Sequence, residues 1–255
     1  MFQEERLSKI EEMVKQKNFC SISELCTIFK ISRATARRDL KILEGRNLLS
    51  LTHGGAKAFA GGTTQEPPYL VKKNINHEEK IRIAQMACSL IKTGETIIID
   101  SGTTAFEMAN IIQTMKNNIT IATNDIQVAC RLANTQSVDL TVLGGSIRKN
   151  YYSTHGFLAQ FALEHIYADK AFIGVDAVEL KKGFMVTNME EIIIKKLIMK
   201  ASKEKIVVCD HSKFESVAFV HLCSINEVNM IITGKELDKE IYSHFIDAGI
   251  NIVLV

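Results

Sequence analysis

The sequence predicts a two-domain α/β protein, in which a small winged helix-turn-helix precedes a larger domain built on a mostly parallel sheet. Apolar residues before residue 57 recur at helical spacing. After residue 73 the chain instead alternates short β-branched runs with helical segments. Between these parts lies GGAKAFAGGTTQEPPYL, which holds both prolines of the chain and shows no sustained period. We therefore expect domains at residues 1–57 and 74–255, joined by a linker at residues 58–73.

Composition and the start of the chain indicate a soluble, non-secreted protein. The 255 residues are 46% apolar, which is enough for a substantial core. No run approaches the ~20 apolar residues that a membrane helix needs, and MFQEERLSKI is charged from its beginning. The six cysteines are scattered without ligand-type spacing, so neither a disulfide framework nor a zinc site is predicted. We expect a cytoplasmic protein with no membrane association, no metal and no cofactor.

Three helices and a short hairpin are expected in the first domain, with the helix-turn-helix at about residues 20–39. The apolar stripe that marks the first helix consists of Leu7, Ile10, Met13 and Val14. The second helix lies in SISELCTIFK, where Ser21 and Glu24 have the spacing of a capping box. The third lies in ISRATARRDLKILEGR and begins after Ser32, its N-cap. The following NLLSLTHGGA is typical of a hairpin, which would form a wing beside the third helix.

The third predicted helix has an apolar face and a basic face. Ala36, Leu40 and Leu43 share one side, which predicts that they pack inward. The opposite side carries four cations, which are Arg33, Arg37, Arg38 and Lys41. A solvated surface would explain an isolated run of charges. The capped helix before this one, the tight turn and the hairpin after it instead favour contact with DNA.

The distribution of charge agrees with a DNA-binding first domain. The whole chain has a formal net charge of +2, but residues 1–57 contain eleven Lys/Arg and seven Asp/Glu, a net charge of +4. The remainder of the chain has a net charge of −2. A basic module attached to a nearly neutral domain is the pattern expected of a nucleic-acid-binding protein.

Seven short runs after residue 73 predict the strands of the second domain. They are TIIID, ITIAT, LTVLGG, KAFIGVD, KIVVCD, NMIIT and NIVLV. Their nearly continuous apolar character is typical of strands that are buried on both faces. Helical segments such as TTAFEMANIIQTM and DIQVACRLA lie between several of them. This alternation predicts a mostly parallel sheet covered by helices on both sides.

The segment IIIDSGTTAFEMA predicts a strand, a loop of small residues and the start of a helix. Ser101 to Thr104 fall where the backbone N–H groups of a helix N-terminus point outward and attract an anion. Gly102 would let a ligand approach closely, and the three hydroxyls could donate hydrogen bonds. A phosphate site and a simple N-cap explain these residues equally well.

Loops of polar residues or glycine also follow the other predicted strands, and the carboxyl ends of parallel strands meet at one edge of a sheet. These residues are Thr123, Asn124, Gly144, Gly145, Asp176 and the segment Asp210 to Lys213. A cation, carboxylates and hydroxyls together suit a phosphorylated sugar or polyol. His211 could bond a sugar hydroxyl, or it could be a capping residue at the surface.

Both domains resemble the DeoR-type bacterial transcriptional regulators. The first carries Ser32, Thr35 and Arg37-Arg38-Asp39-Leu40, followed by His53-Gly54-Gly55-Ala56. The second carries DSGTT, TN, GG, FIGVD and DHSKF. The chain departs from the family pattern at Ala36, Leu51, Ala177 and Gly234. The resemblance implies a second domain similar in fold to ribose-5-phosphate isomerase, with Ser101 to Thr104 on the phosphate of a sugar and with Asp176 and Lys213 facing the sugar.

The motifs and the resemblance together give two sets of candidate residues. The DNA-binding candidates are Ser32, Arg33, Thr35, Arg37, Arg38, Lys41 and His53. The effector-binding candidates are Asp100, Ser101, Gly102, Thr103, Thr104, Thr123, Asn124, Gly144, Gly145, Asp176 and Lys213. Because a carboxylate repels phosphate, we expect Asp39 to orient a neighbouring arginine rather than to contact DNA.

The sequence thus predicts a repressor of a sugar or polyol utilisation operon, released from double-stranded operator DNA by a phosphorylated sugar. Repeated operator half-sites require a homo-oligomer, either a dimer or a tetramer. An isomerase-like enzyme is one alternative, with Asp176, Glu179 and Lys213 moving protons. It has no use for a winged helix, and FIGVDAVE lacks the DGADE-like acidic run of the isomerase. An architectural DNA-binding protein, the other alternative, would not need polar residues at the strand ends.

Overall fold

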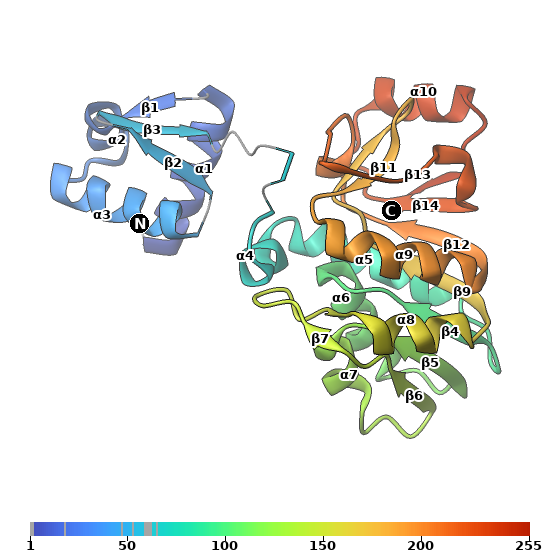
Figure 1. Cartoon of the computed structure of the whole chain (residues 1–255). Helices are drawn as coiled ribbons and strands as arrows, with labels where there is room; N and C mark the ends of the chain where they lie inside the picture. Colours follow the sequence, from blue (N-terminus) through green and yellow to red (C-terminus); the bar gives the residue numbers. More distant parts are fainter. Residues whose placement is uncertain (1–2, 18, 47, 53, 59–62, 65) are drawn as a thin grey trace. The chain divides into compact units, whose positions relative to one another are not determined.

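The computed structural model divides the chain into two units, Met1–Val71 and Lys72–Val255 (Figure 1). The structure describes residues 3–17, 19–46, 48–52, 54–58, 63–64 and 66–255. Each unit has a hydrophobic core of its own. In the described part of the chain, no helix combines the length and the apolar character needed to cross a membrane.

The first unit is a winged helix-turn-helix, as the sequence predicts. Its helices are α1 (Gln3–Lys17), α2 (Ile22–Phe29) and α3 (Arg33–Gly45), and its strands are β1 (Phe19–Ser21), β2 (Leu49–Thr52) and β3 (Gly55–Ala58). The strands pair antiparallel in the order β1-β3-β2. One core joins the apolar stripe of α1 to that of α3, and its buried residues include Leu7, Ile10, Val14, Ala36, Leu40 and Leu43.

Strand β1 is absent from the sequence-based prediction, because three residues are too few to show a period. In the structure Ser21 pairs with Gly55, at the start of β3. A Cβ atom on Gly55 would lie 2.1 Å from the carbonyl oxygen of Cys20. A glycine is therefore required where the wing meets β1, which gives the second glycine of HGGA a structural reason.

The stretch expected as a linker is structured at both of its ends. Strand β3 runs to Ala58, and helix α4 (Tyr69–Asn74) begins directly after Pro67 and Pro68. Proline is well tolerated before a helix, where its missing N–H group would have no partner. Residues 59–62 and 65 of this stretch lie outside the described residues. The boundary between the two units falls inside α4, after Val71.

All seven strands predicted for the second unit are present in one sheet. They are β4 (Thr96–Ile99), β5 (Ile119–Thr123), β6 (Val138–Val142), β9 (Ala168–Ile173), β12 (Ser202–Val208), β14 (Met230–Thr233) and β15 (Ile252–Leu254). Their order is β15-β14-β12-β9-β4-β5-β6, and every pair of neighbours is parallel. The carboxyl ends of these strands therefore lie along one edge, where the candidate effector residues were expected.

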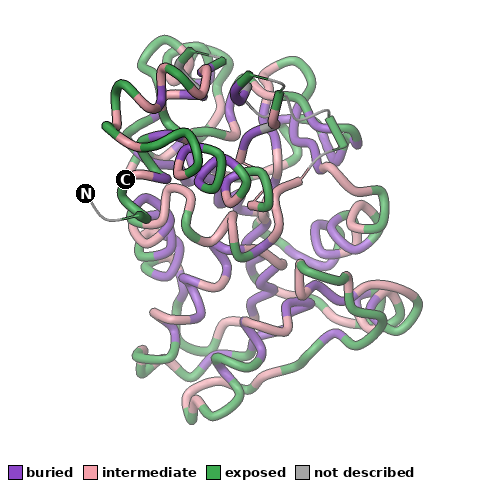
Figure 2. Tube along the Cα trace, turned by 90° about the vertical axis from the view of Figure 1, so that its left-hand side faces the viewer, coloured by how far each residue is buried: buried purple, intermediate pink, exposed green. Residues whose placement is uncertain are grey.

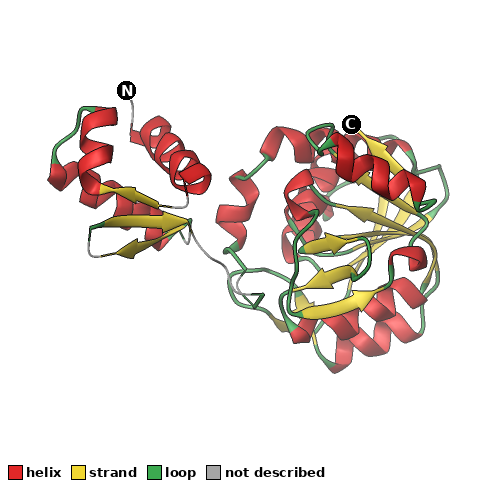
Figure 3. Ribbon diagram, turned by 90° about the horizontal axis from the view of Figure 1, so that it is seen from above, coloured by secondary structure: helices red, strands yellow, loops and turns green. Residues whose placement is uncertain are grey.

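Helices cover both faces of this sheet (Figure 3). Ile97 and Ile99 of β4 face a core shared with α5 (His77–Ser89), α6 (Thr103–Ile112) and α7 (Ile126–Leu132). Ile98 faces the other core, which contains residues of α8 (Phe157–Glu164), α9 (Met189–Lys200) and α10 (Lys239–Asp247). The alternation along β4 is that of a strand buried on both faces, and Figure 2 shows the buried stretches that run through the unit.

Two smaller sheets complete the second unit. Strands β10 (Ala177–Glu179), β11 (Gly183–Val186) and β13 (Val220–Cys223) form an antiparallel sheet in that order. Strands β7 (Ser146–Ile147) and β8 (Thr154–His155) form a hairpin after β6. Short 3-10 turns, η1 (His211–Lys213) and η2 (Ile225–Glu227), follow β12 and β13.

Candidate functional site

The helix-turn-helix is held by caps at both ends of its turn. Lys30 ends α2 in the left-handed conformation, with φ of 51°, and its N–H group bonds the Cys26 carbonyl. The Ser32 hydroxyl accepts a hydrogen bond of 3.1 Å from the Thr35 N–H group, which confirms the predicted N-cap of α3. Ser32 and Thr35 also share a hydroxyl–hydroxyl bond of 2.9 Å. These two DNA-binding candidates thus stand together at the start of α3.

The two faces of α3 are arranged as the sequence predicts. Ala36, Leu40 and Leu43 are buried, so the alanine that departs from the family pattern packs into the core. The four predicted basic residues, Arg33, Arg37, Arg38 and Lys41, are all exposed. Helix α3 therefore presents an uninterrupted cationic ridge to solvent.

Asp39 binds an arginine, but not a neighbour in the sequence. Its carboxylate is fully buried and accepts hydrogen bonds of 2.7 Å and 3.2 Å from the Arg6 guanidinium of α1. The hydrogen bond that Arg6 donates to Asp39 raises the pKa of Arg6. The conclusion that Asp39 does not face DNA agrees with this burial, whereas the arginine that it orients lies 33 residues away. This ion pair holds α3 against α1.

The wing contributes less to the basic surface than the family pattern implies. His53, the remaining DNA-binding candidate, lies outside the described residues. Leu51 packs against the core of the first unit, and its N–H group bonds the Glu44 carboxylate at 3.1 Å. An apolar residue held in this way supplies no charge to phosphate at this position of the wing.

We expect Arg37→Ala and Arg38→Ala each to weaken operator binding by ~1–3 kcal/mol, because each removes a base or phosphate contact. Wild-type affinity should also fall steeply with added salt, since phosphate neutralisation releases counterions. Fluorescence anisotropy with a labelled operator measures both effects. Lys9→Ala is the matched control, because Lys9 is an exposed cation on α1 that pairs with Glu5. If both arginine variants bind the operator as tightly as wild type, the basic residues of α3 form an ordinary solvated surface and do not contact DNA.

In the second unit, a buried ion pair stands at the centre of the carboxyl edge. Asp100 follows β4, and its carboxylate pairs with the Lys195 ammonium of α9. Lys195 also donates to the Gly174 carbonyl at 2.9 Å, and the Gly174 N–H group donates to Asp100 at 3.1 Å. Burial lowers the pKa of Lys195, but the attraction of Asp100 and Glu191 outweighs it, and the net shift is upward. This lysine is therefore charged, and it locks α9 to the ends of β4 and β9.

A cavity of about 10 Å³, which has room for about one water molecule, lies beside this pair. Its lining consists of Asp100, Ser101, Asn124, Arg148, Ser153, Thr154, His155, Glu190, Glu191, Ile194 and Lys195. Two buried acceptors in the lining, Asp100 Oδ1 and Asn124 Oδ1, have no hydrogen-bond partner among the described residues. Such atoms are rare in folded proteins, because an unmade hydrogen bond costs ~1–3 kcal/mol. One donor of about the size of a water molecule, such as a water or a single ligand hydroxyl, fits beside these two acceptors.

The loop before α6 is built largely as predicted. Helix α6 begins at Thr103, with Gly102 at its N-cap position and a φ of 145°, which favours glycine. Thr103 and Thr104 are buried, whereas Ser101 is partly exposed and lines the cavity. One anion already lies here, since the Gly102 N–H group donates to the Asp125 carboxylate at 3.0 Å. Of the candidates in this loop, Asp100 and Ser101 reach the cavity.

Asp125, which binds the Gly102 N–H group at the start of α6, was missed by the sequence-based reasoning. Its carboxylate caps α7 by accepting from the N–H groups of Gln127 and Val128. Burial raises its pKa to about 6, a shift that the backbone donors oppose and that Asp100 reinforces. Protonation of Asp125 would reduce the repulsion of a second anion at the start of α6.

Asp176 and Lys213 form a second polar cluster on the same edge. Asp176 pairs with Lys72 at 3.1 Å and accepts two bonds from Thr187, of 2.9 Å from the N–H group and 3.0 Å from the hydroxyl. Burial raises the pKa of Asp176, but the charges of Lys72 and Lys213 lower it more, and the net shift is strongly downward. The charge of Lys195 also lowers the pKa of Asp176, so Asp176 interacts electrostatically with the Asp100–Lys195 ion pair.

Three other effector candidates have structural roles. The buried hydroxyl of Thr123 accepts from the Asp125 N–H group at 3.1 Å. Gly144 and Gly145 are exposed and lead from β6 to the β7–β8 hairpin. A Cβ atom on Gly145 would lie 2.2 Å from the His155 carbonyl oxygen, so the hairpin requires glycine there. None of the three lines the cavity described above, and their roles in ligand binding stay predictions.

His211 is held by a buried carboxylate. Its Nδ1 atom lies 2.7 Å from Glu79, which also accepts from the His211 N–H group at 2.7 Å. The Gly234 N–H group donates to the same carboxylate at 3.1 Å. A Cβ atom on Gly234 would lie 2.3 Å from Glu79, so this departure from the family pattern makes room for Glu79. Possible ligand atoms of Glu79, Asp210 and His211 lie within 4.8 Å of one another, but Glu79 already binds these protein donors.

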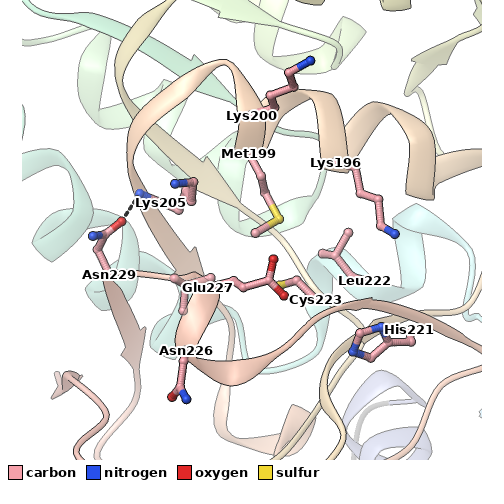
Figure 4. A pocket seen from close by; sticks show the side chains of 11 residues that line it. Lys196, Met199, Lys200, Lys205, His221, Leu222, Cys223, Asn226, Glu227 and Asn229 are labelled. Carbon is pink, nitrogen blue, oxygen red and sulfur yellow. Dashed lines mark hydrogen bonds between the residues drawn. The ribbon is translucent and has the colours of Figure 1, made fainter.

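A second cavity lies elsewhere in the unit, between the end of α9 and η2 (Figure 4). Its lining includes Lys196, Lys200, Lys205, His221 and Asn226. Lys205 belongs to β12 well before the carboxyl end of that strand, so this cavity is not part of the strand-end edge. Its lysines lie near the C-terminal turn of α9, where cations are favoured by the helix dipole alone.

Comparisons with known proteins agree with both units. Residues 6–60 match the model of the DeoR-like helix-turn-helix domain, and residues 75–235 match that of the DeoR C terminal sensor domain. The chain is 33% identical over 246 residues to the lactose phosphotransferase system repressor of Lactococcus lactis subsp. lactis, covering 96% of each chain. It is 32% identical over 235 residues to the HTH-type transcriptional repressor GlcR of Bacillus subtilis (strain 168), covering 92% of this chain and 90% of that protein.

Among solved structures, ribose 5-phosphate isomerase A from Methanocaldococcus jannaschii is similar over 55% of each chain, with 20% sequence identity and a TM-score of 0.40. The two family models together span the winged helix and most of the sensor unit, and the two repressors are similar over nearly their whole length. The chain therefore belongs to the DeoR family of DNA-binding transcriptional regulators.

Proposed function

We propose that the protein represses a sugar or polyol utilisation operon and leaves its operator when a phosphorylated sugar binds the second unit. The cytoplasm, where operator DNA lies, is the proposed compartment. The observation that supports the proposal is the pair of buried acceptors without hydrogen-bond partners, Asp100 Oδ1 and Asn124 Oδ1, at the carboxyl edge of the sheet. Their cavity has a volume of about 10 Å³, so a sugar must widen it on binding. A sugar presents several hydroxyl donors, and it needs such acceptors when it is buried.

The first-turn N–H groups of α6 are the proposed phosphate site. A helix N-terminus leaves these groups without intrahelical acceptors and carries a partial positive charge. Ser101 lines the cavity at this end of α6, and Arg148 adds a cation to the same lining. In this arrangement the phosphate lies near Ser101 to Thr104, and the sugar lies toward Asp100 and Asn124. Lys213 and Asp176 form the farther wall of the proposed site.

Release from DNA requires the effector to bind the DNA-free state more tightly than the DNA-bound state. Lys195 joins α9 to the ends of β4 and β9 next to the proposed ligand. A ligand that engages Asp100 acts directly on this connection. A symmetric homo-oligomer, either a dimer or a tetramer, would let two recognition helices contact two half-sites.

The partners and the lowered pKa of Asp176 favour a sensor over an isomerase. An isomerase needs a carboxylate that can take and return a proton. Asp176 is engaged by Lys72 and Thr187, and its strongly lowered pKa makes it a weak base. We therefore propose that the sugar phosphate is bound and not converted.

Thermal unfolding with a panel of sugar phosphates tests this function. We expect at least one member to stabilise the protein, by about 2.7 kcal/mol at a hundredfold excess over its dissociation constant, since it binds the folded state alone. The unphosphorylated form of the same sugar should have little effect. No isomerisation of ribose 5-phosphate should be detected. Turnover at enzymatic rates that is lost in Asp176→Ala would contradict the proposal.

A further inference from the structure

Helix α8 is apolar on its exposed side as well as on its buried side. Its sequence is FLAQFALE, in which Ala159 and Leu163 are buried in the core. Phe157 and Phe161 nevertheless stand 74% and 52% exposed on the other side. A surface helix is normally polar where it meets water, and a helix that is apolar all round is normally covered.

Neighbouring elements extend this exposed apolar surface. Helices α8 and α9 pack side by side (Figure 1), and the β7–β8 hairpin contacts both of them. We define the α8 face by six exposed large apolar residues, which are Ile147, Phe157, Leu158, Phe161, Met189 and Ile193. Phe157, Phe161 and His165 also lie in a row along α8, with successive ring centroids 6.0 Å and 4.4 Å apart and successive rings tilted by 36° and 35°.

We propose that the α8 face is the interface between two copies of this chain. From their exposed fractions, these six side chains offer on the order of 600 Å² of apolar area, most of the ~800 Å² that each partner contributes to a standard interface. A lone patch of this size is unusual on a monomer. Helix α8 itself carries a single charge, on Glu164, so its apolar residues can meet their own copy near a two-fold axis with little charge between them.

The proposed interface borders the effector cavity. Three residues of the α8 face, Ile147, Met189 and Ile193, are followed in the chain by Arg148, Glu190 and Ile194, which line that cavity. Arg148 and Glu191 pair across the lining at 2.5 Å. The second copy would therefore sit against the far side of the cavity wall. The inference concerns self-association and does not depend on which ligand binds.

Sedimentation velocity of the full-length protein tests the interface. We expect wild type to be a dimer or a larger even oligomer at micromolar concentration. Phe157→Glu and Phe161→Glu should each weaken association by roughly 30-fold or more, the loss typical of a central interface residue. Circular dichroism should show an unchanged fold, because both side chains already face solvent.

Ile246→Glu is the matched control, an exposed apolar residue on α10, which contacts the opposite edge strand β15. It should assemble as wild type does. Leu158→Lys gives a second, independent variant if either glutamate variant fails to fold. The proposal is overturned if wild type is monomeric, as it would be if the first unit of the same chain covered this face. It is equally overturned if folded α8 variants keep the wild-type mass. A monomeric wild type would also contradict the homo-oligomer of the proposed function, whereas α8 variants that keep the wild-type mass would overturn this interface alone. Neither readout involves DNA or a sugar phosphate, so both outcomes leave operator binding and effector binding to their own tests.

Discussion

Arg6→Met should abolish operator binding, although Arg6 belongs to α1 and not to the helix-turn-helix. The substitution leaves the Asp39 carboxylate fully buried without its cation, with the Gln3 side-chain amide at 3.5 Å as a weak remaining donor. Breaking a buried ion pair in this way costs about 3–5 kcal/mol, which approaches the whole stability of a small domain. The first unit should therefore unfold while the second unit stays folded. Anisotropy would record the lost binding, and calorimetry would record one missing transition.

The chain supplies a control that joins the same two helices. Glu4 of α1 pairs with Arg46, just after α3, but both side chains are well exposed. Exposed ion pairs contribute about 0–1 kcal/mol. Glu4→Gln should thus keep operator affinity near that of wild type. If Arg6→Met binds DNA as tightly as Glu4→Gln does, the buried pair does not hold α3 in place.

The second large effect is expected at Lys195. Lys195→Met leaves Asp100 buried and unpaired, and it should lower the free energy of unfolding of the second unit by about 3–5 kcal/mol. Chemical denaturation of wild type and variant measures the difference. Lys196→Met is the matched control, because Lys196 is the next residue of α9 and is exposed. If Lys195→Met lowers the free energy of unfolding no more than Lys196→Met does, the Asp100–Lys195 pair does not stabilise the second unit as expected.

The seven-stranded sheet and the winged helix follow from sequence patterns. The β-branched runs predict strands buried on both faces, and the spacing of Ala36, Leu40 and Leu43 predicts which side of α3 is buried. Strand β1 escapes prediction because pairing with β3, and not local sequence, makes it extended. The helix in the predicted linker escapes for a related reason, since two prolines signal a break but can also precede a helix start.

The sequence predicted three residues of the cavity lining, Asp100, Ser101 and Asn124, and missed most of the cations at this edge. Strand-end residues such as Asp100 and Asn124 stand out because polar residues interrupt apolar runs. Lys195, Arg148 and Lys72 reach the same edge from a helix, a hairpin and the joint between the two units. No local pattern marks them, because a lysine within a helix resembles any solvated lysine until tertiary packing buries it. Asp125 carried a weak signal, since it stands at the N-cap of a predicted helix directly after Asn124.

Operator release by a phosphorylated sugar, read in cavity variants, tests the central claim most directly. Operator-bound wild type, Asn124→Ala and Asn226→Ala are titrated with the sugar phosphate that stabilises wild type. Asn124 lines the cavity at the strand ends, and Asn226 lines the one beside η2 (Figure 4). We expect wild type and Asn226→Ala to release DNA at the same concentration, and Asn124→Ala to need roughly 3- to 10-fold more, the loss of one hydrogen bond to the ligand. Release of all three at one concentration, or no release of wild type by any sugar phosphate, would contradict the account.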